Sequence, residues 1–224
     1  MNSINIIIAI IYNEFLLFYR NFTDVLSIFL FFILGIIIFV FAIGYDELIL
    51  NKIGIGIIWA LILLSNNLSL RKFYQDDFDN GNLIIFHMSG LSYELIVIIK
   101  ILTIWIFLQL PFFLIIPIAW LLLNINMQNF ELVLLSFLIG SPIITCISSI
   151  SGSMNLLNKK NFAIGSLIIM VLSIPIIIFS VNLVDTSEEV IRAQINILIG
   201  ILCFFLAITP WASSLCIKFA IQNN

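Results

Sequence analysis

The sequence has few charged residues for its length. Only 9% of its 224 residues are Asp, Glu, Lys or Arg, and it contains a single histidine. A typical soluble domain carries about 25% charged residues. Hydrophobic residues instead make up 62% of the chain, and the mean hydropathy is +1.24. These values exclude an ordinary soluble domain and indicate that most of the chain lies in a lipid bilayer.

The long apolar runs also lack the alternation of polar and apolar residues that a membrane β-barrel requires. A helical span needs about 20 mostly apolar residues, and the sequence offers six such stretches. We therefore predict an all-α polytopic membrane protein, one transmembrane domain over residues 1–224. Its spans are expected at about 25–43, 53–70, 101–123, 132–150, 162–184 and 195–217.

Catalytic signatures are missing as well. The sequence contains no G-x-x-x-x-G-K-[ST] phosphate loop, no H-E-x-x-H and no G-x-S-x-G. Cys146, Cys203 and Cys216 form no C-x-x-C pair, and His87 has no second ligand near it. We expect no catalytic residue, no disulfide and no metal or cofactor bound directly. A chain without a nucleotide site that performs work takes its energy from a partner.

The distribution of basic residues predicts the orientation of the spans, because cytoplasmic loops carry the excess of Lys and Arg. If six spans alternate, only Lys52 and Arg192 lie on one side. The other seven lie opposite: Arg20, Arg71, Lys72, Lys100, Lys159, Lys160 and Lys218. Both termini are therefore expected on the cytoplasmic side, or on the matrix side in an organelle.

Residues 1–24 precede the first span and have apolar residues at helical spacing. Ile4, Ile7, Ile8, Ile11, Phe15 and Phe18 recur in this way, interrupted by polar side chains. The pattern is typical of an amphipathic helix lying in the membrane interface. A frayed, irregular N-terminus is the alternative.

Polar residues within the predicted spans are few. Gln109 lies inside the third span and Ser148 inside the fourth, whereas Lys100 and Glu131 are placed at span ends. No charged residue is expected deep in a span, which argues against a proton-coupled carrier. Hydrogen bonding between helices explains the Ser, Asn and Gln residues better than a substrate path does.

Against this background, an acidic cluster between the second and third predicted spans stands out. Asp76, Asp77 and Asp79 lie close behind Arg71 and Lys72. Gly81 suits a left-handed turn that ends one short helix and lets another begin. We predict a short helical hairpin within 71–94 that presents these carboxylates, with Phe73, Tyr74 and Phe78, to the cytoplasm. Docking to a peripheral protein and a merely solvated loop both remain open on these residues alone.

Several short stretches resemble one family of membrane proteins in order and spacing. They are Gly56-Ile57-Ile58-Trp59-Ala60, Phe73-Tyr74-Gln75-Asp76-Asp77, Asp79-Asn80-Gly81-Asn82-Leu83, Gly140-Ser141-Pro142, Ile174-Pro175-Ile176 and Thr209-Pro210-Trp211-Ala212. With them the chain resembles CcmB, the membrane subunit of the ABC-type complex of cytochrome c maturation. One departure is Met88-Ser89-Gly90-Leu91-Ser92, where the family commonly has Leu-Pro repeats.

The resemblance implies a fold like that of ABC-2-type transporter subunits, with an interfacial N-terminal helix and a cytoplasmic coupling helix. It implies pairing with the ATPase CcmA, association with CcmC, CcmD and the haem chaperone CcmE, and two copies of the chain per complex. The residues carried over to the ATPase contact are Phe73, Tyr74, Asp76, Asp77, Asp79, Gly81 and Leu83. ATP would be bound by the partner and haem handled by the complex, in a bacterial inner or mitochondrial inner membrane. No nucleic-acid partner is expected.

Two classes of function remain. The chain is either a non-catalytic subunit that couples ATP hydrolysis to release of haem-loaded CcmE, or a permease for haem or another small substrate. A passive scaffold that tethers the ATPase is a third, weaker alternative.

Overall fold

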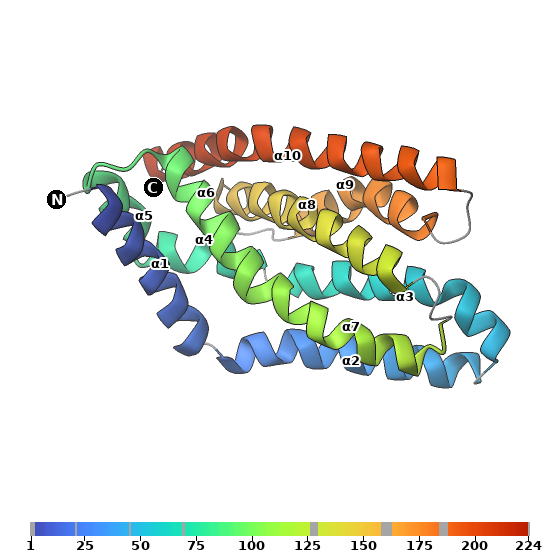
Figure 1. Ribbon diagram of the computed structural model, residues 1–224. Helices are drawn as coiled ribbons and strands as arrows, with labels where there is room; N and C mark the ends of the chain where they lie inside the picture. The colour runs from blue at the N-terminus through green and yellow to red at the C-terminus, as the bar shows by residue number, and fades with distance from the viewer. Residues whose placement is uncertain are drawn as a thin grey trace.

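The chain folds into a bundle of long helices (Figure 1). The computed structural model describes residues 3–20, 22–44, 46–68, 70–125, 130–157, 163–183 and 188–223, and the regular structure in these residues is helical throughout. The elements are α1 (Ser3–Arg20), α2 (Phe22–Ile43), α3 (Glu47–Leu68), α4 (Leu70–Asp79), α5 (Asn82–Met88), α6 (Tyr93–Ile104), the π-helix η1 (Trp105–Gln109), α7 (Leu110–Leu122), α8 (Phe130–Leu157), α9 (Ala163–Val181) and α10 (Glu188–Gln222).

Six helical segments of the described chain are long and apolar enough to cross a membrane, which confirms the predicted fold class. The predicted bounds are close for α2 and α9 but too short elsewhere. Helix α8 runs to Leu157 and α10 covers Glu188–Gln222, beyond the expected 132–150 and 195–217. These extensions carry polar residues that a hydropathy window leaves out but that a helix accommodates at its ends.

The third span differs most from the prediction, because α6 begins at Tyr93 and not near residue 101. Ser92 caps this start, with its hydroxyl oxygen accepting a hydrogen bond from the Leu95 N–H at 3.4 Å. The earlier start places Lys100 inside the helix, where it is fully buried. Lys100 therefore lies within α6 and not at the helix start, while its depth in the membrane stays a prediction.

Helix α8 lies at the centre of the bundle and packs against α9, α10 and α4. Small residues let α8 approach its neighbouring helices closely, as expected for helices within a membrane. A Cβ atom at Gly140 would collide with the ring of Trp59 on α3. The Ser151 hydroxyl donates to the Gly165 carbonyl of α9 at 2.5 Å, which joins α8 and α9 closely.

Both chain termini lie at one end of the bundle, together with α4 and α5 (Figure 1). At this end Lys218 near the end of α10 bonds to Glu94 in the first turn of α6, with 2.7 Å between Nζ and Oε1. The hairpin of α4 and α5 and the two termini thus face the same side of the bundle. The assignment of that side to the cytoplasm stays a prediction.

The predicted N-terminal helix is present as α1 and ends at Arg20. Its inner face carries Ile10 and Glu14, both almost fully buried. Ile8, Ile11 and Phe15 of the predicted apolar set are exposed instead. An exposed apolar face on a helix outside the spans suits the membrane interface, and that location stays a prediction.

Candidate functional site

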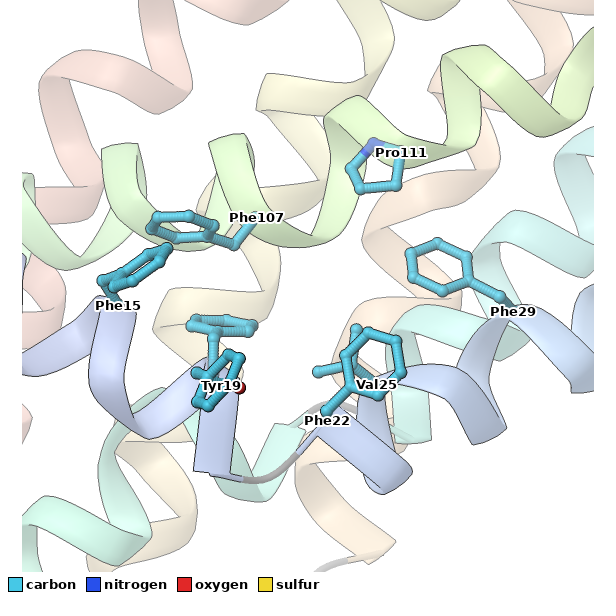
Figure 2. Close-up of a pocket in the computed structure, with 8 residues that line it drawn as sticks. Phe15, Tyr19, Phe22, Val25, Phe29, Phe107 and Pro111 are labelled. Carbon is cyan, nitrogen blue, oxygen red and sulfur yellow. The ribbon is translucent and has the colours of Figure 1, made fainter.

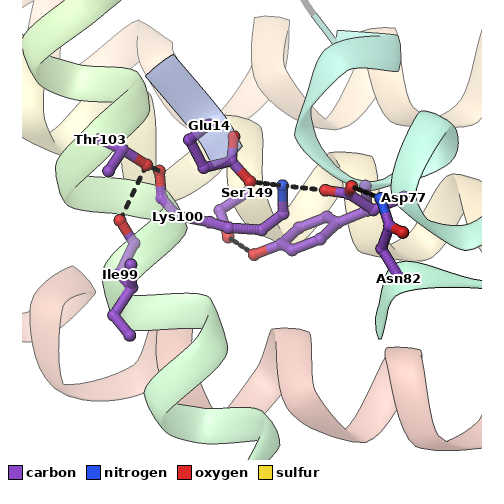
Figure 3. Close-up of polar contacts among 8 residues, drawn as sticks. Glu14, Asp77, Asn82, Ile99, Lys100, Thr103 and Ser149 are labelled. Carbon is purple, nitrogen blue, oxygen red and sulfur yellow. Dashed lines mark hydrogen bonds and ion pairs between the residues drawn. The ribbon is translucent and has the colours of Figure 1, made fainter. Parts of the chain in front are cut away.

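Three charged side chains from three helices meet inside the end of the bundle that carries the termini (Figure 3). Lys100 of α6 lies between Glu14 of α1 and Asp77 of α4. Its Nζ is 2.6 Å from Glu14 Oε1 and forms a second ion pair with Asp77. The three side chains are only 1–3% exposed. Because burying an unpaired ion costs several kcal/mol, each of these charges depends on the others.

We call Glu14, Asp77 and Lys100 the ion triad. With all three groups ionised it carries a formal net charge of −1, since two carboxylates share one ammonium. Burial raises the pKa of Glu14; the Lys100 ammonium opposes this shift and the Asp77 carboxylate adds to it. Proton binding at Glu14 would neutralise the triad as a whole.

Two further contacts connect the ion triad to its surroundings. The side-chain amide of Asn82, the first residue of α5, donates to Asp77 Oδ1 at 2.9 Å. The ring of Tyr74 lies under the Lys100 ammonium, with 5.8 Å from Nζ to the ring centroid. The first contact joins α5 to α4 within the acidic hairpin, and the second joins the hairpin to the third span.

Tyr74 extends these connections to the centre of the bundle. Its hydroxyl lies 2.7 Å from Ser149 Oγ on α8, and Ser149 Oγ lies 3.2 Å from Ser213 Oγ on α10. All three residues are buried. Helix α4 therefore has direct polar contacts to α5, α6 and α8, and reaches Glu14 of α1 through Lys100.

Most of the residues predicted to contact a partner are buried in the bundle and not exposed on its surface. Phe73, Tyr74, Asp77 and Leu83 are each at most 2% exposed, and Phe78 is also buried. On a helix of 3.6 residues per turn, the α4 residues of this set fall on one face, and that face packs on the bundle. They are therefore buried in the bundle and not presented at its surface as expected, and their assignment to an ATPase contact stays a prediction.

The remaining predicted residues lie on the surface. Asp76 and Asp79 are exposed on the opposite face of α4, and the Gln75 amide donates to both Asp79 carboxylate oxygens at 3.0 and 2.9 Å. Gly81 has φ +74° and separates α4 from α5, which confirms the predicted left-handed turn between two short helices.

The sequence reasoning missed Glu14 and Lys100 as site residues. A signal was present, because Lys100 is the only cation in the apolar run that continues from α6 into α7. A lone charge inside an apolar helix requires a partner. Which carboxylates supply it depends on the packing of α1 and α4 and not on spacing along the chain.

An apolar pocket of about 290 Å³ lies where α1 turns into α2 (Figure 2). The Phe107 ring extends from η1 of the third span to α1, where its centroid lies 5.6 Å from that of the Phe15 ring and 5.2 Å from that of the Phe18 ring. The lining residues are Phe15, Phe18, Tyr19, Phe22, Val25, Phe29, Phe107 and Pro111. None of these eight side chains supplies a charge or an imidazole, so the pocket suits hydrocarbon better than a haem with its propionates.

The fold and the site define the class of this protein. It is a six-span helical membrane protein in which a short acidic hairpin between the second and third spans is fixed to an N-terminal helix by buried charges. The chain belongs to the CcmB family, whose family model, described as "CcmB protein", matches residues 5–220.

Individual relatives agree with this assignment. The chain is 28% identical to the heme exporter protein B of Haemophilus influenzae over 220 residues, which cover 97% of this chain and 100% of that protein. It is 30% identical to the heme exporter protein B of Bradyrhizobium diazoefficiens over 191 residues, 83% of this chain and 85% of that protein. A match to the Pseudomonas aeruginosa protein of the same name has 24% identity and covers 97% and 98% of the two chains.

Proposed function

We propose that this chain is the transmembrane subunit of an ABC-type complex in c-type cytochrome biogenesis. In this proposal, ATP hydrolysis by the partner ATPase CcmA drives release of the haem-loaded chaperone CcmE. Membership of the CcmB family and the printed name of the relatives, heme exporter protein B, support a role in haem handling. The sequence has no nucleotide-binding motif of its own, so its part in the complex is mechanical and not catalytic.

The observation that carries the proposal is the buried pairing of Asp77 with Lys100 and Glu14. A hairpin held to the bundle only by apolar contacts could slide against neighbouring helices at little cost. Buried ion pairs are specific in geometry and expensive to break. A force applied to α4 is therefore transferred to α6 and α1, as a coupling element requires.

The proposed partners follow the resemblance of the sequence to the family. Two copies of the chain would pair with two CcmA subunits and associate with CcmC, CcmD and CcmE in a bacterial or mitochondrial inner membrane. The side of the bundle with α4, α5 and both termini would face the cytoplasm or matrix. The seven-to-two distribution of basic residues supports this orientation.

A permease is the second candidate, favoured by buried polar atoms in the spans. Gln109 Oε1 and Ser148 Oγ are buried and have no hydrogen-bond partner within the described part of the chain. Such atoms are costly in a membrane interior unless water or a substrate reaches them. The two candidates differ in whether haem itself crosses the bilayer through this subunit.

Purified complex reconstituted in vesicles separates the candidates. A coupler should release haem-loaded CcmE when ATP is hydrolysed, and should not do so with a non-hydrolysable analogue. A permease should instead move haem into or out of the vesicle lumen in the absence of CcmE. ATP-driven haem movement without CcmE would refute the coupling proposal, and a complex with Gln109→Leu serves as the matched control for a polar path.

A further inference from the structure

The apolar pocket between α1, α2 and the third span has no part in the proposed function, although three elements combine to form it (Figure 2). Phe107 and Pro111 of the third span lie on one side, and Phe22 and Phe29 of α2 lie on the other. Phe22 and Phe29 are about two turns apart, roughly 10 Å along the helix axis. The lining is therefore elongated along the start of α2.

The chemistry of this lining favours a hydrocarbon chain. The pocket volume of about 290 Å³ exceeds the roughly 150 Å³ in which an apolar protein cavity takes up benzene. Water would find almost no hydrogen-bond partner there, because the Tyr19 hydroxyl is the only polar side-chain group among the eight lining residues. A flexible run of methylene groups therefore suits the pocket better than water does.

The position of the pocket indicates where such a chain comes from. The part of α2 that is long and apolar enough to cross a membrane begins at Val25, which lines the pocket. Leu26 and Leu30 follow on the same helix and are exposed, as expected for a span in contact with acyl chains. A lipid of the bilayer can therefore enter the pocket with one of its acyl chains.

The polar end of the pocket matches the head group of a phospholipid. Arg20 follows the lining residue Tyr19, ends α1 and is exposed. A guanidinium pairs with phosphate oxygens through two parallel hydrogen bonds. A hydrocarbon without a head group would fill the pocket but would make no use of this cation.

We propose that the apolar pocket binds one phospholipid. One acyl chain lies along α2 between Phe22 and Phe29, and the phosphate lies at Arg20 where α1 ends. The chain is already surrounded by hydrocarbon before it binds, so the hydrophobic effect adds little to its affinity. Preference for this site over the bulk bilayer comes from close packing against the aromatic rings and from the phosphate–guanidinium contact.

The bound lipid would support the ion triad without touching it. Phe15 directly follows Glu14 on α1, and its ring lies 5.6 Å from that of Phe107. Phe107 follows Lys100 by about two turns along the third span. A chain packed beside these rings would hold α1 against the third span, so loss of the lipid should loosen the contact between Glu14 and Lys100.

Photo-labelling locates the lipid directly. The full chain is reconstituted in phosphatidylcholine nanodiscs with a small fraction of phosphatidylglycerol that carries a diazirine in its acyl chain, and labelled peptides are identified by mass spectrometry. We expect labelling at Phe29 and Phe107 that excess unlabelled phosphatidylglycerol suppresses. Leu34 and Ile38 of α2, which are 54% and 65% exposed, are the matched control, since bulk lipid should label them without competition.

Labelling confined to exposed positions such as Leu34 and Ile38 would overturn this inference. Labelling at Phe107 that excess phosphatidylglycerol leaves unchanged would also overturn it. The measurement uses neither the ATPase nor haem, so its failure would leave the proposed function intact.

Substitutions provide a second test, read as the phosphatidylglycerol that the purified chain retains in native mass spectrometry. Val25→Trp fills the pocket and should lower retention at least about tenfold, whereas Leu34→Trp should change it less than about twofold. Arg20→Gln leaves the packed side chains in place and should lower retention about fivefold, with Lys52→Gln on α3 as its control. Unchanged retention in Arg20→Gln, or in a folded Val25→Trp variant, would refute the site.

Discussion

Removing the cation of the ion triad should destabilise the protein strongly. In Lys100→Met the side chain keeps a similar length but loses the charge, so Glu14 and Asp77 stay buried beside each other without a counter-ion. Breaking a buried ion pair by removing one partner costs about 3–5 kcal/mol. Lys218→Met is the matched control, because it breaks an ion pair whose side chains are 41% and 31% exposed and should cost at most about 1 kcal/mol.

Neutralising all three members should restore the fold without restoring the proposed coupling. In the triple variant Glu14→Met, Asp77→Asn and Lys100→Met, no buried charge remains, and the new Asn retains an oxygen that accepts from Asn82. Replacing a whole buried ion cluster by well-packed hydrophobic residues of similar volume is often neutral or stabilising by about 1–4 kcal/mol, and two of the three replacements here are hydrophobic. The thermal stability of the triple variant should therefore reach or exceed that of the wild type.

The decisive assay compares stability with function in the same variants. Unfolding temperature in detergent reports the fold, and haem staining of c-type cytochromes in cells reports maturation. We expect Lys100→Met to lose both, and the triple variant to keep its fold and its ATPase while maturing little cytochrome. Wild-type levels of mature cytochrome in a stable triple variant would refute the idea that the ion triad transmits motion.

Three further predictions address the turn, the spans and the titration of the site. Gly81→Ala places a Cβ in open space at φ +74°, so its cost is the backbone penalty of about 1–2 kcal/mol, seen as a lower unfolding temperature. Gln109→Leu removes the hydrogen bond to Asn66 at a cost of about 1 kcal/mol; maturation should persist, and its loss would favour the permease. Burial raises the pKa of Glu14 above 4.5. At a pH between 4.5 and the folded pKa, Glu14 therefore keeps its proton in the folded protein but has released it in the unfolded chain. The stability due to this proton is complete below pH 4.5 and falls as pH rises through the folded pKa, so Glu14→Gln should flatten that decline in unfolding temperature.

The helices and the hairpin could be predicted from the sequence because they depend on local patterns. Apolar runs of sufficient length fix the spans, and Gly81 marks the turn between α4 and α5. The start of α6 was missed because hydropathy weighs Tyr93 and Glu94 against a span, whereas a helix cap at Ser92 makes both acceptable in a first turn.

The interior of the candidate site could not be predicted, because it is made by packing. The sequence predicts the acidic cluster as a surface feature, but the helical period of α4 turns Asp77 inward while Asp76 and Asp79 face outward. Glu14 lies 86 residues before its partner Lys100, and no local pattern links the two. Their contact follows only once α1 is folded against the third span.

The location of the buried charges also explains why a chain so poor in charge retains them. Among lipid-embedded helices, apolar contacts give little orientation, since lipid tails and Leu side chains are equally apolar. In the proposed function, the hairpin must keep one fixed register against the third span in order to move it. The ion triad supplies that register at a single point, where α1, α4 and α6 meet. A purely apolar contact at this point could be as stable as the ion triad or more so. The ion triad instead provides a specific connection between the surface hairpin and the membrane-embedded bundle.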